Sequence, residues 1–521
     1  MKKINEKVLV LFFILIILQG CSSGGREDRL ELRNFFQVGA YDQGLQFLEK
    51  SKFYQDKDER LLALMERGML LHSKGEWEKS SQVLDEARSL STQLYTISLS
   101  KKAEKTLLND NYDQFYGEIY ERSLLHFYLS LNAILNYQKT QKRDDLFRAR
   151  AEVLAWDSFL SSIKEDRLGK SVYKNDLLLK IYGAKIHEMV GTREDRQIAL
   201  QLFKDARDVI FKNYNTYPSF NKNYKEFKKD FESLSSKSIE EVKKNYIFES
   251  DLQKNILDYI NENINRLSKK EGKNHSKEGK TSVTVILEKG MIAEKVAEKS
   301  FYGLDFLAKE PLVAFFAADV LGLLPAAHSY NPGGAFMGVF VASAALQSVG
   351  VGFELPKVLN TNSPGKQTLI VFDKNNKEVL TKDISLVNPL GDIAEEAIYE
   401  ASAWNYARVG IRLATKHATA IAASFATYKA LGGGKNSNEN FLAKNAAVIQ
   451  YVGAAKLIEE SEKADTRYWS TLPNEIRLVD LLLAPGHYRL ELILNSEQKM
   501  SLGEVEVVAQ ELPQLFNFRK F

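Results

Sequence analysis

The hydrophobic pattern of the chain changes once along its length, and this change constrains the fold more than any other feature. From about residue 30 to residue 266 apolar residues recur every three or four positions, which is typical of helices that bury one face. From residue 282 onward short segments alternate apolar and polar residues, as half-buried antiparallel strands do. A chain of 521 residues is also too long for a single core. The sequence therefore predicts an α+β multidomain protein.

Internal repeats in the helical half follow the spacing of tetratricopeptide (TPR) hairpins. The clearest copy runs from Gly68 to Ala87, an earlier copy starts at Gly39, and a looser copy starts at Gly183. In this spacing small residues let the first helix touch the second, and large residues fill the groove between them. The sequence predicts a TPR-like helical domain over 30–266, and an irregular α-bundle is the alternative.

The second half is predicted to be a β-rich, sandwich-like domain over 282–521 with inserted helices. Five segments carry the strand pattern, namely 282–287, 367–372, 476–481, 488–494 and 502–508. The Pro485-Gly486 turn is expected to lead into the last hairpin, and a long helix is expected over 393–431. Residues 267–281 are rich in lysine and glycine and are predicted to form an exposed linker between the halves.

An apolar insert is predicted over 311–356. It contains two apolar stretches, 312–327 and 335–352, and the first carries Asp319 and is short for a bilayer span. Buried or partner-facing helices are the favoured interpretation. A membrane-inserting hairpin is the alternative.

The N-terminus predicts export and lipidation. Three lysines precede an apolar run that ends at Leu18, and Gly20 stands just before Cys21, the one cysteine of the chain. This pattern is typical of a bacterial lipoprotein signal over 1–20, in which lipid is attached to Cys21 and residues 21–29 form a tether. An uncleaved signal anchor is the alternative. Because Ser22 follows the cysteine, the anchor is expected on the periplasmic side of the outer membrane.

Composition and motifs give no support for catalysis. The net charge of +3 argues against a nucleic-acid partner, which needs a concentrated basic surface. His187-Glu188 lacks the second histidine of a zinc motif, so no metal site is predicted. Leu431-Gly-Gly-Gly-Lys435 lacks the residues of a phosphate loop and is expected to end a helix. We expect no catalytic residues and no cofactor.

Two other groups of residues were weighed as sites. Asp465 and Arg467 are expected to pair across a turn while Trp469 enters the core, which is a structural role. Arg408, Arg412 and Lys416 recur every four residues on the long helix and form one basic face. A solvated or ion-paired face is the ordinary interpretation of that spacing, and an anionic partner-binding surface is the functional one.

The chain resembles an uncharacterised family of Gram-negative cell-envelope lipoproteins with TPR-like N-terminal helices. The resemblance rests on the lipid-attachment motif and on four later stretches, namely 116–132, 148–152, 285–295 with Glu354-Leu-Pro356, and 464–473. The last, Ala-Asp-Thr-Arg-Tyr-Trp-(2)-Leu-Pro, is the most specific. The resemblance covers most of the chain and implies a membrane-anchored envelope protein without an established activity. The apolar insert and the long linker depart from it.

Together these features predict a non-enzymatic interaction scaffold of the cell envelope. Lipid on Cys21 would bind the membrane, and the TPR-like groove would bind an unidentified envelope protein or peptide. An oligomeric membrane-inserting or secretion-type component is one alternative, and the sequence leaves homo-oligomerisation open. An envelope hydrolase whose site is not visible in the sequence is the other.

Overall fold

The structure is a computed structural model that describes residues 25–101, 114–163, 176–212, 217–222, 250–269, 279–302, 351–360, 364–431, 439–494, 498–510 and 512–521. Helices occupy most of the first half of the chain and sheets lie in the second half. The mixed α and β composition predicted from the sequence is therefore confirmed. Within the described residues, no helix is both long enough and apolar enough to cross a membrane.

The first half consists of helices that pack in consecutive pairs. The bounds are α2 Arg26–Gln37, α3 Tyr41–Lys50, the short 3₁₀ helix η1 Lys57–Glu59, α4 Arg60–Ser73, α5 Trp77–Lys101, α6 Ile119–Thr140, α7 Arg143–Ser162, α8 Leu177–Val190, α9 Arg193–Lys212 and α12 Asp251–Ser268. The pairs α2/α3, α4/α5, α6/α7 and α8/α9 are hairpins. Gly68 allows the close contact in one of them, because a Cβ atom there would overlap the side chain of Leu84.

The second half contains two four-stranded sheets and a two-stranded ribbon. The strands are β1 Thr281–Lys289, β2 Glu294–Tyr302, β3 Val351–Leu359, β4 Gln367–Asp373, β5 Glu378–Asp383, β6 Ser385–Asn388, β7 Glu475–Leu483, β8 Gly486–Leu494, β9 Gln498–Val507 and β10 Gln514–Lys520. Sheet 1 has the order β10-β1-β7-β6, sheet 2 has the order β5-β4-β8-β9, and β2 pairs with β3.

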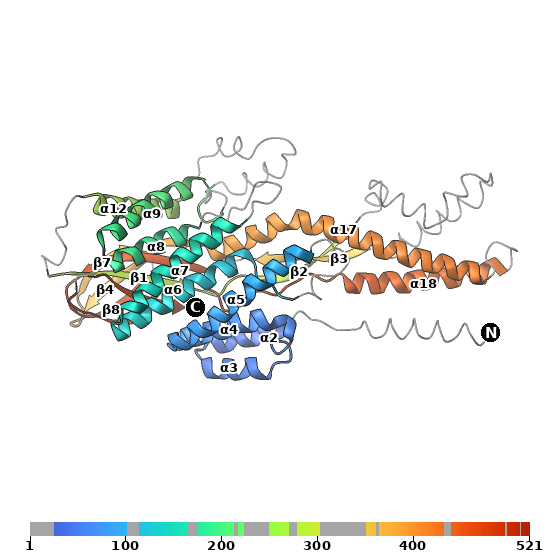
Figure 1. The fold of residues 1–521 in the computed structure, drawn as a ribbon, viewed down its shortest axis with the longest axis horizontal. Coiled ribbons are helices and arrows are strands. Elements are labelled where there is room, and N and C mark those ends of the chain that lie inside the picture. The colour runs from blue at the N-terminus through green and yellow to red at the C-terminus, as the bar shows by residue number, and fades with distance from the viewer. Residues whose placement is uncertain are drawn as a thin grey trace.

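Sheet 1 lies between the helices and sheet 2. Val283, Val285 and Leu287 of β1 pack in one core with the strands of sheet 2. Ile286, which points to the opposite face of the same strand, belongs to the core formed with the helices. Because both faces of sheet 1 are covered, β1 is buried along almost its whole length. Figure 1 shows the helices α6 to α9 and α12 on one side of the strands.

The helices of the first half form two rows. We call α4, α6 and α8 the inner helices, because they face sheet 1, and α6 and α8 are buried over nearly their full length. We call α5, α7 and α9 the outer helices, because each has one exposed face.

A long projection, which we call the arm, extends from the sheets. It consists of β2, β3 and the two long helices α17 (Leu390–Ala430) and α18 (Glu439–Ser461). The helices pack side by side, and Figure 1 shows them running away from the sheets. Phe353 of β3 joins Val409 of α17 and Tyr451 of α18 in a separate small core. The arm thus has a small core of its own, while the first turns of α17, at Leu390 and Ile393, belong to the core shared with sheet 1 and the helices.

One sequence-based expectation about this half is wrong in part. The predicted helical insert over 311–356 ends in a strand, because residues 351–356 belong to β3, while residues 303–350 lie outside the described part. The Pro485-Gly486 turn leads, as expected, into the last hairpin, because β8 pairs with β9. The strand before the turn, β7, lies in the other sheet.

Candidate functional site

The residues of the predicted lipid site lie outside the described part of the chain, which begins at Gly25. These residues are Leu18, Gly20 and Cys21. The first described helix nevertheless fixes where the tether starts. Arg26 of α2 forms an ion pair of 2.6 Å with Glu294, the first residue of β2. The N-terminal segment therefore enters the structure at the base of the arm.

The predicted corner around Asp465 is a buried ion-pair cluster. Both carboxylate oxygens of Asp465 accept hydrogen bonds of 2.9 Å from the guanidinium of Arg467. A third contact of 2.7 Å joins Arg467 to Glu59 at the end of η1. The Arg467 guanidinium holds the pKa of Asp465 near 2, against the opposing effect of burial. Trp469 is fully buried in the core shared with the helices.

The segment from Arg467 to Leu472 lies against the inner helices and is held through its backbone. Glu121 of α6 accepts a hydrogen bond of 2.6 Å from the main-chain N–H of Trp469. Glu66 of α4 accepts one of 2.7 Å from the N–H of Ser470. Both carboxylates are completely buried. Burial and the neighbouring charge of Glu118 raise the pKa of Glu121 to about 8.

The chain itself therefore fills the face of the helical layer where a peptide partner was expected. Besides the Arg467–Leu472 segment, sheet 1 contributes direct polar contacts to this face. Tyr128 of α6 donates a 2.6 Å hydrogen bond to Glu288 of β1, and Lys185 of α8 forms a 2.6 Å ion pair with Asp480 of β7. A partner bound to this face would have to displace sheet 1.

The basic face of the long helix is turned inward where its side chains are described. Arg412 is 2% exposed and its guanidinium contacts Glu462, just beyond α18, at 3.1 Å. Lys416 contacts the other oxygen of the same carboxylate at 2.6 Å. The interpretation of Arg412 as an exposed partner-binding residue is therefore wrong, because these cations hold α17 to the end of α18. The side chain of Arg408 lies outside what the structure describes.

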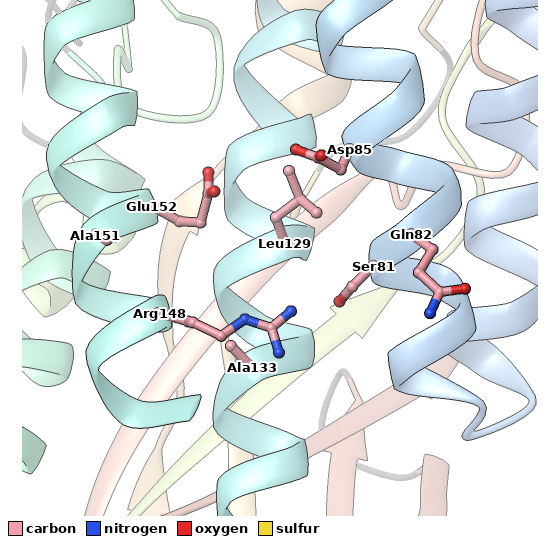
Figure 2. Close-up of a pocket in the computed structure, with 8 residues that line it drawn as sticks. All are labelled: Ser81, Gln82, Asp85, Leu129, Ala133, Arg148, Ala151 and Glu152. Carbon is pink, nitrogen blue, oxygen red and sulfur yellow. The ribbon is translucent and has the colours of Figure 1, made fainter. Parts of the chain in front are cut away.

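A pocket of about 310 Å³ opens on the outer side of the helical layer, between α5 and α7. Figure 2 shows α6 beneath it, with Leu129 and Ala133 forming the floor. The walls are lined by Ser81, Gln82 and Asp85 of α5 and by Arg148, Ala151 and Glu152 of α7. The sequence analysis did not find this pocket, because its residues come from three helices and share no motif.

The charges around the pocket are largely paired. Arg88 donates two hydrogen bonds, of 2.9 and 3.0 Å, to the carboxylate of Glu152 and also pairs with Asp85. Arg148 forms an ion pair of 3.1 Å with Asp145. One guanidinium thus binds both carboxylates and offsets one of their two negative charges. A hydrolase that uses two carboxyl groups, one as an acid and one as a base or nucleophile, needs surroundings that give the two groups different pKa values.

No cluster of metal-ligating side chains is present within the described residues. One histidine and carboxylate pair has a geometry that resembles a catalytic dyad. His187 Nδ1 lies 2.6 Å from Asp195, and both side chains are buried. Asp195 also accepts hydrogen bonds from Thr192, in the turn between α8 and α9, and from Arg150 of α7. The pair therefore joins the ends of a helical hairpin.

Comparison of the chain with protein-family models, with curated proteins and with solved structures gives no match.

Proposed function

We propose that the chain is a cell-envelope lipoprotein, anchored through lipid on Cys21 to the periplasmic face of the outer membrane, that acts as a non-enzymatic interaction scaffold. The contact element in this proposal is the arm. The body of helices and sheets would hold the arm at a fixed place beside the membrane. The observation that carries the proposal is the pairing of Tyr302 with Val351 at the end of the ribbon.

That pairing brings the two ends of residues 303–350 together on the arm. Glu294 of β2 pairs with Leu359 of β3 near the base, and the strands continue for nine residues to Tyr302 and Val351. At about 3.3 Å per residue the ribbon carries this junction roughly 26 Å from the base. Between Pro311 and Gly350 the sequence holds one charged residue, Asp319. A segment of that composition is suited to contact with an apolar surface.

The tether supports the same arrangement. Five peptide units separate Cys21 from Arg26, and a chain of that length spans at most about 18 Å. Because Arg26 is paired with Glu294, lipid on Cys21 would hold the base of the arm close to the membrane surface. The arm would then search for its partner in two dimensions, which raises the effective concentration of a weak contact.

We further propose that the hairpins α2/α3, α4/α5, α6/α7 and α8/α9 are a TPR-like array. In this proposal the array does not present its inner face to a partner. It instead binds the Arg467–Leu472 segment and sheet 1 of the same chain. The array would thereby serve as the rigid support of the arm.

Entry of residues 303–350 into a bilayer is a second candidate function. The low charge of its central part favours it, because Asp319 is the one charged group between Pro311 and Gly350 and its charge would have to be neutralised. In this form the protein would be an oligomeric or secretion-type component of the envelope. The two candidates differ in whether the segment meets a protein or a lipid surface.

Two variants separate the candidates. In the first, Cys21→Ser removes the lipid. In the second, residues 303–350 are replaced by a four-residue Gly-Ser turn between Tyr302 and Val351. We expect Cys21→Ser to leave the membrane fraction, and the loop variant to remain there while losing its partner in in-cell crosslinking. A Cys21→Ser protein that stays in the membrane fraction after a high-salt wash would instead support bilayer entry. Retention of every crosslink by the loop variant would contradict the role of the arm.

A further inference from the structure

The base of the arm contains a cluster of oxygen-bearing side chains, which we call the junction site. It consists of Asn360 just after β3, Gly391, Asp392 and Glu395 in the first turns of α17, and Asn474 just before β7. Because α17 packs against β3, the site lies where these two elements meet the body. Asp392 and Asn474 are 3% and 4% exposed, and Glu395 is half-buried.

The two carboxylates of the junction site share one hydrogen-bond donor. Nδ2 of Asn360 donates a hydrogen bond of 2.9 Å to Oδ1 of Asp392 and lies 3.5 Å from Oε2 of Glu395. In the part of the chain that the structure describes, neither carboxylate has a cationic side chain as its partner. Burial, with a smaller contribution from the charge of Glu395, raises the pKa of Asp392 to about 6. The site therefore carries negative charge that no described side chain offsets.

Two amide oxygens of the same site have no donor. Oδ1 of Asn360 and Oδ1 of Asn474 are buried and accept no hydrogen bond from any described residue. They lie beside the same point, because a Cβ atom at Gly391 would be 2.9 Å from the first oxygen and 2.5 Å from the second. A buried acceptor without a donor has lost its bonds to water and gained none, so this arrangement is unfavourable as it stands.

We propose that the junction site binds a Ca²⁺ ion through oxygens of Asp392, Glu395 and Asn360. A half-turn of the Asn360 amide about its Cβ–Cγ bond exchanges the places of Nδ2 and Oδ1. Oδ1 would then face the two carboxylates, and Nδ2 would face Oδ1 of Asn474 and supply the donor that this oxygen lacks. Without a cation, the same turn would set three acceptor oxygens against one another. Binding of the ion and rotation of the amide are therefore coupled.

The chemistry of the site favours Ca²⁺ over other metal ions. Its side-chain ligands are all oxygens, whereas zinc and copper are bound mainly by nitrogen and sulfur. Groups of three or more His, Cys, Asp or Glu side chains are absent from the described residues, and this site combines two carboxylates with a neutral amide. Ca²⁺ accepts such mixed oxygen sets in flexible geometry, and Mg²⁺ demands a stricter octahedron. With two charged ligands we expect a weak site, with a Kd of about 10⁻⁴–10⁻³ M.

A cation at this place would fix the arm relative to the body. It would join the end of β3, at Asn360, to the first turns of α17. The same turns are already connected to the body through backbone groups. The N–H of Gly391 donates a 3.0 Å hydrogen bond to the carbonyl of Asn474, and the N–H of Ser219 donates one of 2.8 Å to Oδ2 of Asp392. Ion binding does not require the partner proposed above, so each idea can fail without the other.

The first test is a calorimetric titration of the EGTA-treated full-length protein with CaCl₂ at pH 7.5, above the pKa of Asp392. We expect Glu395→Gln to weaken binding at least about tenfold, because it removes a charged ligand. Glu298→Gln removes a carboxylate from an exposed ion pair elsewhere on the arm and should leave the affinity unchanged. Equal affinity of the two variants, no binding by the native protein, or binding of MgCl₂ as tight as that of CaCl₂ would each overturn the proposal.

The second test separates ion binding from a structural role of the amide. Asn360→Asp adds a third carboxylate, so in EGTA we expect its Tm to be lower than that of the native protein. Saturating CaCl₂ should raise the Tm of this variant by more than it raises the native Tm, because the ion gains a charged ligand. If Asn360 served only as a hydrogen-bond donor, the loss in Tm would be the same with and without CaCl₂. That result would contradict the proposed site.

Discussion

The main-chain N–H of Ser470 donates a 2.7 Å hydrogen bond to the side chain of Glu66, although 404 positions separate the two residues. The N–H and the hydroxyl of Thr471 bind the other oxygen of the same carboxylate. The second helical hairpin is therefore joined directly to the segment that connects the arm to sheet 1. The two halves of the chain are parts of one packed body at this point.

The first prediction concerns the buried cation of that segment. Arg467→Met would leave the carboxylates of Asp465 and Glu59 without their partner, and we expect it to lower the free energy of unfolding by about 3–5 kcal/mol. Arg60→Met breaks an exposed pair with Glu86 and should cost less than about 1 kcal/mol. Urea unfolding of both variants is the measurement. Equal losses would show that the cluster around Arg467 does not stabilise the fold.

The second prediction concerns the contact between α4 and α5. A Cβ atom at Gly68 would overlap Leu84, so Gly68→Ala should destabilise the protein by about 1–3 kcal/mol. Gly453 lies within α18, where a Cβ atom would meet no neighbour. Gly453→Ala should therefore stabilise by up to about 1 kcal/mol, because alanine favours the helix. Thermal unfolding of the two variants tests the opposite signs, and destabilisation by both would contradict the role given to Gly68.

The third prediction follows from the buried carboxyl of Glu121. Its pKa is about 8 in the folded protein, against 4.5 for an ordinary glutamate, so the folded state holds the proton more tightly. Stability from this group is complete below about pH 4.5 and is lost as the pH rises to about 8. Glu121→Gln removes the titration. The free energy of unfolding of the native protein, relative to that of Glu121→Gln, should therefore decrease between pH 4.5 and 8. A difference between the two proteins that does not change with pH would refute the assignment.

The fourth prediction has the opposite sign and concerns the arm. Burial lowers the pKa of His417 on α17 to about 4, from 6.5, and the charge of Lys416 acts in the same direction. The folded arm therefore loses stability as the pH falls from about 6.5 to 4, because the unfolded arm takes up the proton first. The protection of α17 and α18 amides, measured as the exchange rate relative to that of an unfolded chain at the same pH, should decrease over this range in the native protein. In His417→Gln, which does not titrate, the decrease in protection should be smaller.

Local pattern was enough to find many of the elements. Four of the five predicted strand segments lie within β1, β4, β7 and β8, and the fifth, 502–508, overlaps β9 except at its last residue. The long helix expected over 393–431 agrees with α17 to within three residues at its start and one at its end. Each of these has the alternation or the helical spacing that its burial requires. The pairing of Asp465 with Arg467 also follows from their separation by two positions.

Partners that are distant in sequence could not be found in this way. The strand β2 was not predicted, because its sequence is rich in charged residues. Lys295 of this strand is buried beside Glu118, to which it donates a 2.9 Å hydrogen bond, and the two residues are 177 positions apart. The spacing of the basic face at Arg412 allowed an ion-paired interpretation but did not identify the partner, because Glu462 lies beyond the end of α18. Glu66 did leave a signal, since it is a single acid in the apolar stretch of α4.

The C-terminal strand β10 lies beside β1, at the edge of sheet 1, and runs parallel to it. Leu515 of this strand belongs to the core that contains the inner helices. During synthesis the inner helices therefore emerge long before this strand. The part of their apolar surface that β10 covers stays open until the last residues have been added. A protein cut short before residue 514 would be a substrate for proteolysis.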